Sequence, residues 1–375
     1  MTVNCTDIVE KAASGRRLSP EEGRALLTSS DLLSLGDVAH RIKQQKTGNQ
    51  VFFNVNCHIN LTNLCVSRCA FCAFSCDPGD PRAYTMTVDQ VMEKARSALP
   101  LGITEFHIVS GLHPDLPFSY YVEVVRSLKK EYPHIHIQAF TAVEIKYFAD
   151  ISGLSVADVL LHLKEAGLGS LPGGGAELFS ERLRQKLCPK KASAQEWLDV
   201  MRTAHTLGLK SNATMLFGLG ERPEDIMHHL VCIRNLQDET GGFQSFIPLP
   251  FHPRNTQLSF LQKPRGYEIL RMYALARLML DNIAHIKAFW IMVGIPLAQL
   301  SLLFGVDDLD GTVIEEKITH AAGAETDTAI SKQKLVQIIQ EAGKTPVERD
   351  TLYNIIKMYA DTAFGSQSSA RNLGG

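Results

Sequence analysis

The cysteines at positions 65, 69 and 72 are the residues of this sequence best suited to hold a metal centre. They form the pattern Cys-x3-Cys-x-aromatic-Cys, with Phe71 as the aromatic residue. Thiolates bind zinc and iron–sulfur clusters, and centres with a structural or electron-transfer role usually have four protein ligands. Three thiolates leave one iron of a [4Fe–4S] cluster open to a small molecule. The spacing therefore favours a cluster that is a reactant site as well as an electron carrier.

A zinc site is the alternative, because Cys57 and Cys76 lie close enough in the sequence to supply a fourth thiolate. Zinc sites, however, usually pair two short Cys-x2-Cys knuckles that lie some distance apart. Residues 77–81, Asp-Pro-Gly-Asp-Pro, are typical of a turn that leads away from Cys76. We therefore expect a [4Fe–4S] cluster with three cysteine ligands, Cys65, Cys69 and Cys72, and packed thiols at Cys5, Cys57, Cys188 and Cys232.

Three histidines are candidates for contact with a substrate. His58, His113 and His252 each lie beside the end of a predicted strand. In a parallel barrel the carboxyl ends of the strands form the mouth where chemistry takes place, so we expect catalytic roles for these three. We find no Ser–His–Asp or Cys–His arrangement with comparable support, and nucleophilic hydrolysis is the weaker hypothesis.

The rest of the chain repeats a strand followed by a helix. Residues 51–61 alternate apolar and polar side chains, as a strand does, and lead directly into the cysteine loop. Thr87–Gln90 is a capping box that predicts the start of a helix. Further strands are predicted at 106–109, 134–140, 168–171, 210–217, 242–248 and 285–290, with helices at 120–131, 155–166, from 193 and around 267–282.

Six or more such units imply a parallel sheet with helices outside. We expect an α/β fold with a full (βα)8 TIM-type barrel rather than a six-unit partial barrel, because strand-like segments continue to about Trp290. The predicted domains are a helical N-terminal extension (1–50), the barrel core (51–320), and a C-terminal helical extension and tail (321–375). The cysteine loop then lies at the carboxyl-end mouth of the barrel.

Two further motifs resemble binding sites but lack the required spacing. Gly173–Gly175 is neither a Walker loop nor Gly-x-Gly-x-x-Gly, so a nucleotide-phosphate site is not expected. The aspartates of residues 307–312 do not follow the calcium-loop register of an EF-hand. We expect a capped turn there.

Composition excludes several classes of protein. Lys and Arg number 38 against 40 acidic residues in 375, so there is no basic field for nucleic acid or an anionic membrane. No run approaches the roughly 18 apolar residues that span a bilayer, and the first residues lack a signal-peptide pattern. We expect a cytoplasmic protein whose cysteines are ligands or buried thiols rather than disulfides.

The cysteine motif resembles that of the radical S-adenosylmethionine (SAM) superfamily. At a finer level the chain resembles the aminofutalosine synthases, radical SAM enzymes of the futalosine route to menaquinone, from about residue 50 to Tyr353. The near relatives are the dehypoxanthine futalosine cyclases and the enzymes that form the deazaflavin chromophore. Phe140–Glu144 and residues 77–81 are more like the synthases. The segments that carry the resemblance are 63–84, 106–115, 139–145, 171–177, 247–253 and 307–312.

The resemblance implies an unusual reaction. The 5′-deoxyadenosyl radical adds to 3-[(1-carboxyvinyl)oxy]benzoate, the aryl group migrates, and carboxylate is lost to give 6-amino-6-deoxyfutalosine. It also implies that SAM is a co-substrate and that flavodoxin or ferredoxin donates the electron. The alternatives are a cyclase-like or deazaflavin-forming radical SAM enzyme and, more remotely, a zinc-stabilised barrel that binds a ligand.

The resemblance also assigns roles to individual residues. Phe71 would lie near the adenine of SAM, and Ser110 and Gly111 would approach its amino group. Substrate carboxylates would be held by Arg82, with His113 and His252 as further candidates. The other expected contacts of SAM are Glu144, Glu177, Arg182 and Asn212.

Overall fold

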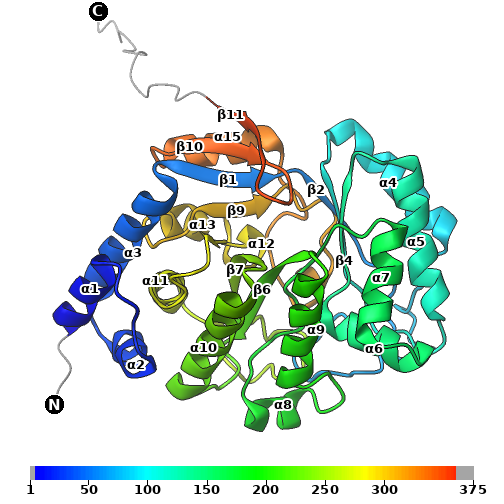
Figure 1. Ribbon diagram of the computed structural model, residues 1–375, viewed down its shortest axis with the longest axis horizontal. Coiled ribbons are helices and arrows are strands. Elements are labelled where there is room, and N and C mark those ends of the chain that lie inside the picture. Colours follow the sequence, from blue (N-terminus) through cyan, green and yellow to red (C-terminus); the bar gives the residue numbers. More distant parts are fainter. Residues whose placement is uncertain (1–4, 360–375) are drawn as a thin grey trace, which may run out of the picture.

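A parallel sheet of seven strands forms the centre of the protein (Figure 1). The structure is a computed structural model and describes residues 5–359. Neighbouring strands pair in chain order from β2 to β8, and every pairing is parallel. The strands are β2 (Asn56–Ile59), β3 (Glu105–Ile108), β4 (His136–Ala139), β5 (Ser170–Leu171), β6 (Lys210–Phe217), β7 (Phe243–Pro250) and β8 (His285–Ile286).

Strand β9 (Asp308–Gly311), which pairs with β1 (Gln50–Asn54), lies between the last and the first strand of this sheet. Parallel bridges join Lys287 to Asp308 and Cys57 to Ile314. The Ala288 N–H donates to the Asp308 carbonyl at 2.8 Å, and the His58 N–H donates to the Ile314 carbonyl at 3.0 Å. The predicted parallel α/β barrel is thus confirmed, as a curled sheet of seven strands whose first and last strands β9 bridges. The turn expected at 307–312 is wrong, because these residues lie between β8 and β2 as a strand.

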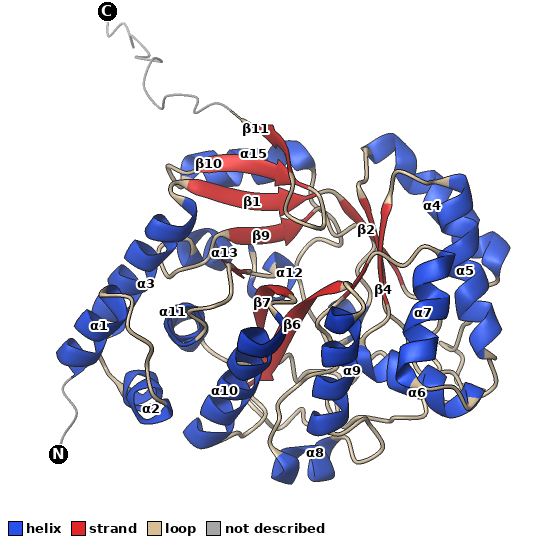
Figure 2. Ribbon diagram, viewed as in Figure 1, coloured by secondary structure: helices blue, strands red, loops and turns tan. Residues whose placement is uncertain are grey.

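Helices cover the outside of the sheet, and further helices form the amino-terminal part of the chain (Figure 2). The capping box at Thr87 forms as predicted, and a second one forms at Ser19, each with reciprocal hydrogen bonds to the third helical residue. The helices are α1 (Cys5–Ala13), α2 (Pro20–Thr28), α3 (Leu32–Thr47), α4 (Val88–Ala98), η1 (Leu99–Leu101), α5 (Phe118–Glu131), α6 (Ala142–Ser152), α7 (Val156–Ala166), α8 (Glu181–Leu187), α9 (Ala194–Thr206), α10 (Pro223–Thr240), α11 (Gly266–Met279), α12 (Trp290–Val293), α13 (Ile295–Ser301), α14 (Ile318–Ala321) and α15 (Lys332–Glu341). Within residues 5–359 the structure contains no helix of the length and apolar character that a bilayer crossing requires.

The two faces of the sheet differ in chemistry. Residues paired across neighbouring parallel strands point to the same face, and successive residues alternate between faces. His58, His107 and Gln138 are paired in one row and face the barrel interior, where they line a cavity. Phe106 and Ile137 alternate with them and are fully buried. The apolar core therefore lies between sheet and helices, while the inward-facing row of β2, β3 and β4 is polar.

The carboxyl-terminal part of the chain builds a second sheet. Strand β10 (Thr345–Arg349) pairs in parallel with β1 (Gln50–Asn54), and β11 (Ile355–Met358) pairs antiparallel with β10. The strand order is β11-β10-β1-β9. The predicted C-terminal extension was expected to be helical, and in fact it contains α15 and two strands. The domain boundaries at 50 and 320 stay predictions, and the tail from residue 360 lies outside the described residues.

The turn between β10 and β11 fills the amino end of the barrel. The Thr351 hydroxyl and the Asn54 amide each donate to Oε2 of Glu105, at 2.7 and 2.8 Å. The Tyr353 ring stacks on His285, with 3.8 Å between the ring centroids. Glu105 and His285 are the first residues of β3 and β8. We refer to residues 350–354 as the plug.

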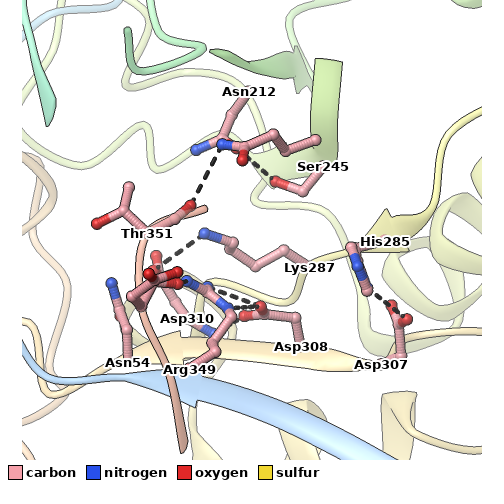
Figure 3. A network of polar contacts seen from close by, with 12 residues as sticks. Asn54, Asn212, Ser245, His285, Lys287, Asp307, Asp308, Asp310, Arg349 and Thr351 are labelled. Atoms are coloured by element: carbon pink, nitrogen blue, oxygen red, sulfur yellow. Dashed lines mark hydrogen bonds and ion pairs between the residues drawn. The ribbon is translucent and has the colours of Figure 1, made fainter. Parts of the chain in front are cut away.

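Two adjacent aspartates fix β9 in place from both of its faces (Figure 3). Arg277 of α11 donates to Asp307 at 2.8 Å, and both side chains are fully buried. The Arg349 guanidinium donates to Asp308 at 2.7 Å. His285 lies 2.9 Å from the other oxygen of Asp307. The strand that closes the barrel is therefore held by charges buried among the surrounding elements.

We predict that Asp307→Ala lowers the free energy of unfolding by about 3–5 kcal/mol, because it leaves the guanidinium of Arg277 buried without its counter-charge. Urea unfolding followed by circular dichroism measures the change. Arg254→Ala is the control, since Arg254 and its partner Glu325 are 67% and 76% exposed. It should change the free energy by no more than about 1 kcal/mol. Equal losses in the two variants would contradict the importance of the buried pair.

Candidate active site

A cavity of about 350 Å³ lies at the carboxyl ends of the barrel strands. Its wall includes residues from the loops that follow β2, β3, β4 and β5, and its floor is formed by side chains that point inward from the strands. This is the position expected for the site of a parallel barrel. The cavity contains most of the candidate site residues that the sequence indicates.

The three cysteines face this cavity from one loop. Cys65, Cys69 and Cys72 all line it, whereas Cys76 does not. Cys76 is buried, and its Sγ accepts a hydrogen bond from the Asn63 amide at 3.3 Å. Cys76 is therefore a packing residue of the loop.

Gly111 explains how the loop after β3 can approach the cysteine loop. A Cβ atom at this position would lie 2.3 Å from the Leu64 carbonyl oxygen, a distance that real Cβ atoms do not show. Only glycine allows this approach of two backbones without displacement. The prediction of a backbone contact at Ser110 and Gly111 thus agrees with their place in the cavity wall.

The thiols suit an iron–sulfur cluster by donor type and direction. Within residues 5–359 no three His, Cys, Asp or Glu side chains already converge as a metal site. A hydrogen bond with Cys188 and burial raise the pKa of Cys69, and burial raises the pKa of Cys72. Three thiols on an eight-residue loop that open into one cavity are a donor set that fits a cluster with three protein ligands.

Two carboxylates line the cavity after β4 and β5, Glu144 in α6 and Glu177 in the loop before α8. Glu144 is buried and accepts from the Ser110 N–H at 2.9 Å and the Thr141 N–H at 2.7 Å. Burial raises the pKa of Glu144 to about 7. Glu177 forms an ion pair with Lys191, whose Nζ lies 5.5 Å from the centroid of the Phe71 ring. The predicted SAM contacts Phe71, Ser110, Gly111, Glu144, Glu177 and Asn212 all line the cavity.

Two predicted arginines lie outside the cavity, so the structure does not support their proposed roles. The Arg182 side chain is 47% exposed and binds Asp225 of α10 at 2.8 Å. The Arg82 side chain is 66% exposed and binds Asp80 at 2.7 Å. Arg182 lies in the first turn of α8 and Arg82 in the loop before α4, and each is paired with an acidic side chain. Local sequence patterns do not distinguish such surface ion pairs from ligand contacts.

Of the three histidines, two line the cavity. His58 stacks on His107 with 4.5 Å between ring centroids, and burial lowers its pKa well below the ordinary value. His252 donates from Nε2 to the Met292 carbonyl at 2.8 Å, and burial lowers its pKa. His113 instead accepts the backbone N–H groups of the turn that follows it, through Nδ1. Its expected catalytic role is therefore not supported.

Sequence reasoning missed several residues of the cavity. His107 and Gln138 lie on predicted strands, in the row of His58, and inward alternation could have found them. Lys287 directly follows β8, and Asp310 lies in the segment expected to be a turn. Lys191 follows α8 in a loop with no pattern that would place it in the cavity.

Comparisons with known proteins agree with this site. Residues 59–233 match the radical SAM superfamily, and residues 240–362 match the CofH/MqnC C-terminal region. The chain is 20% identical to methylornithine synthase, whose crystal structure superposes with a TM-score of 0.73 over 90% of this chain and 97% of that one. The likeness shows that the two share a fold.

Curated relatives match over nearly their whole length. Aminodeoxyfutalosine synthase of Streptomyces coelicolor is 43% identical over 94% of each chain, and that of Thermus thermophilus is 45% identical over 94% of this chain and 96% of its own. The 5-amino-6-(D-ribitylamino)uracil–L-tyrosine 4-hydroxyphenyl transferase of Methanopyrus kandleri is 40% identical, over 95% and 98%. The chain therefore belongs to the radical SAM superfamily and, within it, to the family of the aminodeoxyfutalosine synthases.

Proposed function

We propose that the protein transfers the 5′-deoxyadenosyl group of SAM to 3-[(1-carboxyvinyl)oxy]benzoate and so forms 6-amino-6-deoxyfutalosine for menaquinone biosynthesis. The observation that carries the proposal is the identity of 43–45% to two aminodeoxyfutalosine synthases over 94% of the chain. Membership of the radical SAM superfamily implies a [4Fe–4S] cluster and SAM. When bound, the cluster supplies the electron that cleaves SAM to an adenosyl radical, with flavodoxin or ferredoxin as the proposed donor.

In this proposal Cys65, Cys69 and Cys72 hold the cluster. Their common direction into the cavity supports the assignment, and so does the exclusion of Cys76 from it. A zinc knot would need a fourth thiolate near the other three. Cys188, which hydrogen-bonds Cys69, comes from a distant part of the chain and does not complete a paired-knuckle pattern.

The residues around the cysteine loop bind and orient SAM. Glu144 fixes the backbone of Ser110 through the hydrogen bond to its N–H, which leaves the neighbouring carbonyls to accept from the amino group of SAM. Glu177 is suited to the ribose or the amino group, and Phe71 to the adenine. Asn212 contributes from the floor, where its Oδ1 already accepts from Ser245 at 2.8 Å.

The barrel holds the substrate and excludes side reactions. His58 and His252 line the cavity with their imidazoles buried and their pKa values lowered, so they are neutral near pH 7. Neutral imidazoles can donate or accept hydrogen bonds without adding charge. The apolar side chains of the cavity lining, among them Leu216, Ile247 and Phe289, help to keep water away from a reactive radical once the reactants fill the cavity.

A deazaflavin-forming activity is the second candidate, and the 40% identity to the transferase of Methanopyrus kandleri favours it. Both activities use the same cluster and barrel. They differ in the fate of the adenosyl group, which a hydrogen-abstracting enzyme releases as 5′-deoxyadenosine and an adding enzyme retains in its product.

We predict that Cys65→Ala, Cys69→Ala and Cys72→Ala each lose most of the cluster and all turnover, because one iron loses its ligand. Cys76→Ala is the matched control from the same loop and should keep both. Iron and sulfide analysis and the brown absorption that dithionite bleaches measure the cluster after anaerobic reconstitution. A requirement for Cys76 but not for Cys65 would overturn the ligand set, and a colourless protein with stoichiometric zinc would support the zinc alternative.

We also predict that SAM labelled in the ribose delivers its label to a benzoate-containing product. The reaction contains the reduced protein and 3-[(1-carboxyvinyl)oxy]benzoate without oxygen. The product, methionine and released carboxylate are followed together. Label found chiefly in 5′-deoxyadenosine, with the acid intact, would reject the synthase activity while leaving the radical SAM assignment in place.

A further inference from the structure

The cavity is poor in positive charge. Among the residues of the described chain that line it, the lysine and arginine side chains are Lys191 and Lys287. Lys191 forms an ion pair with Glu177, lies over the Phe71 ring and interacts electrostatically with Cys69. Lys191 therefore belongs to the part of the cavity beside the cysteine loop. This leaves Lys287 as the cation of the barrel floor.

Lys287 has hydrogen-bonding capacity that the protein does not use. Its ammonium group carries three N–H donors. Within the described residues it makes a single hydrogen bond, to Oδ1 of Asp310 at 3.3 Å (Figure 3), beyond the usual 2.7–3.2 Å range. The side chain is only 6% exposed. A buried ammonium with one long hydrogen bond retains donors for an acceptor that enters the cavity.

His58 offers a second polar group on the same floor. Its side chain is buried, lines the cavity, and has no hydrogen-bond partner at Nε2. The positive charge of Lys287 is close enough to contribute to the lowered pKa of His58. A buried imidazole nitrogen without a partner costs free energy unless a ligand satisfies it. Lys287 and His58 together form a donor pair suited to the two oxygens of a carboxylate.

We propose that Lys287 binds the benzoate carboxylate of the aromatic substrate, with Nε2 of His58 as the second contact. The inference rests on the proposed function and adds the subsite that recognises the acid. Asp310 holds the ammonium group in place when no substrate is bound. A charge-assisted hydrogen bond in this buried site is stronger than one between neutral groups.

The chemistry of the substrate selects which of its two carboxylates binds here. The carboxylate of the enol ether leaves during the reaction, and pairing it with a buried cation would stabilise it against loss. The benzoate carboxylate is retained in the product and can keep the same contact throughout. It is also remote from the double bond, which must face SAM on the cysteine side of the cavity. The Lys287 subsite therefore fits the end of the substrate that does not react.

The test compares the acid with its analogue in which the benzoate group is a benzamide. Both are titrated without oxygen into the cluster-containing protein before SAM is added, and without reductant, so that no turnover occurs. The wild type should bind the acid about 10- to 100-fold more tightly than the amide. Lys287→Met should abolish this preference by weakening the acid alone, and Lys287→Arg should retain part of it. Lys130→Met, at an exposed position of α5, is the matched control with the wild-type ratio.

Iron content and SAM affinity measured on each variant show that the site is intact. Should Lys287→Met fail to fold because Asp310 is left unpaired, the variant Lys287→Met/Asp310→Asn removes both charges and serves in its place. If Lys287→Met prefers the acid to the amide as strongly as the wild type does, and the wild type converts the acid to labelled product, the inference is wrong and the proposed function stands. A wild type that neither binds nor converts the acid overturns the inference together with the proposed function.

Discussion

The burial of two neighbouring carboxylates on opposite faces of one short strand determines the form of the barrel. Asp307 points outward to Arg277 of α11, and Asp308 points inward to Arg349. Successive residues of a strand face opposite sides. One of these two neighbouring aspartates therefore binds the helical layer, and the other binds a residue on the inner side. Each of these buried carboxylates would lack a counter-charge without its guanidinium, at a large cost in free energy. The position of β9, and with it the closure of the barrel, follows from these two pairs.

This closure also shapes the cavity. Because β9 lies beside β8, Asp310 faces the floor next to Lys287. The same segment bridges back to Cys57, one residue from His58. Polar groups of the first and last parts of the barrel are thereby brought onto one floor. A sheet left open at this point would expose that floor to water and weaken every electrostatic contact within it.

The features that could be predicted from the sequence are those that have a local pattern. The cysteine loop, the Gly-rich turn after β5 and the strand-helix alternation have local patterns that do not depend on the rest of the chain. The capping box at Thr87 likewise depends on residues three positions apart. These features were predicted correctly. The resemblance to a known family extended them to the expected contacts of SAM.

Other features depend on partners far away in the sequence and could not be predicted. Asp307 and Asp308 resemble turn residues until Arg277 and Arg349 are placed beside them. Arg182 resembles a ligand contact until Asp225 is found at 2.8 Å. A local sequence pattern does not show which partner a charged side chain has. That partner is a residue that the fold brings near from elsewhere in the chain. The buried lysine of the floor was missed for the same reason.

The plug has a consequence for the order of events during turnover. Thr351 and Tyr353 occupy the amino end of the barrel, so small molecules exchange through the carboxyl end, where the cysteine loop lies. An aromatic acid bound to Lys287 would lie deeper in the barrel than SAM, which binds near the cysteine loop. The acid would then have to enter before SAM closes over it, and the product would leave only after methionine has departed. Because the barrel is open at one end only, its two reactants would bind and leave in a compulsory order.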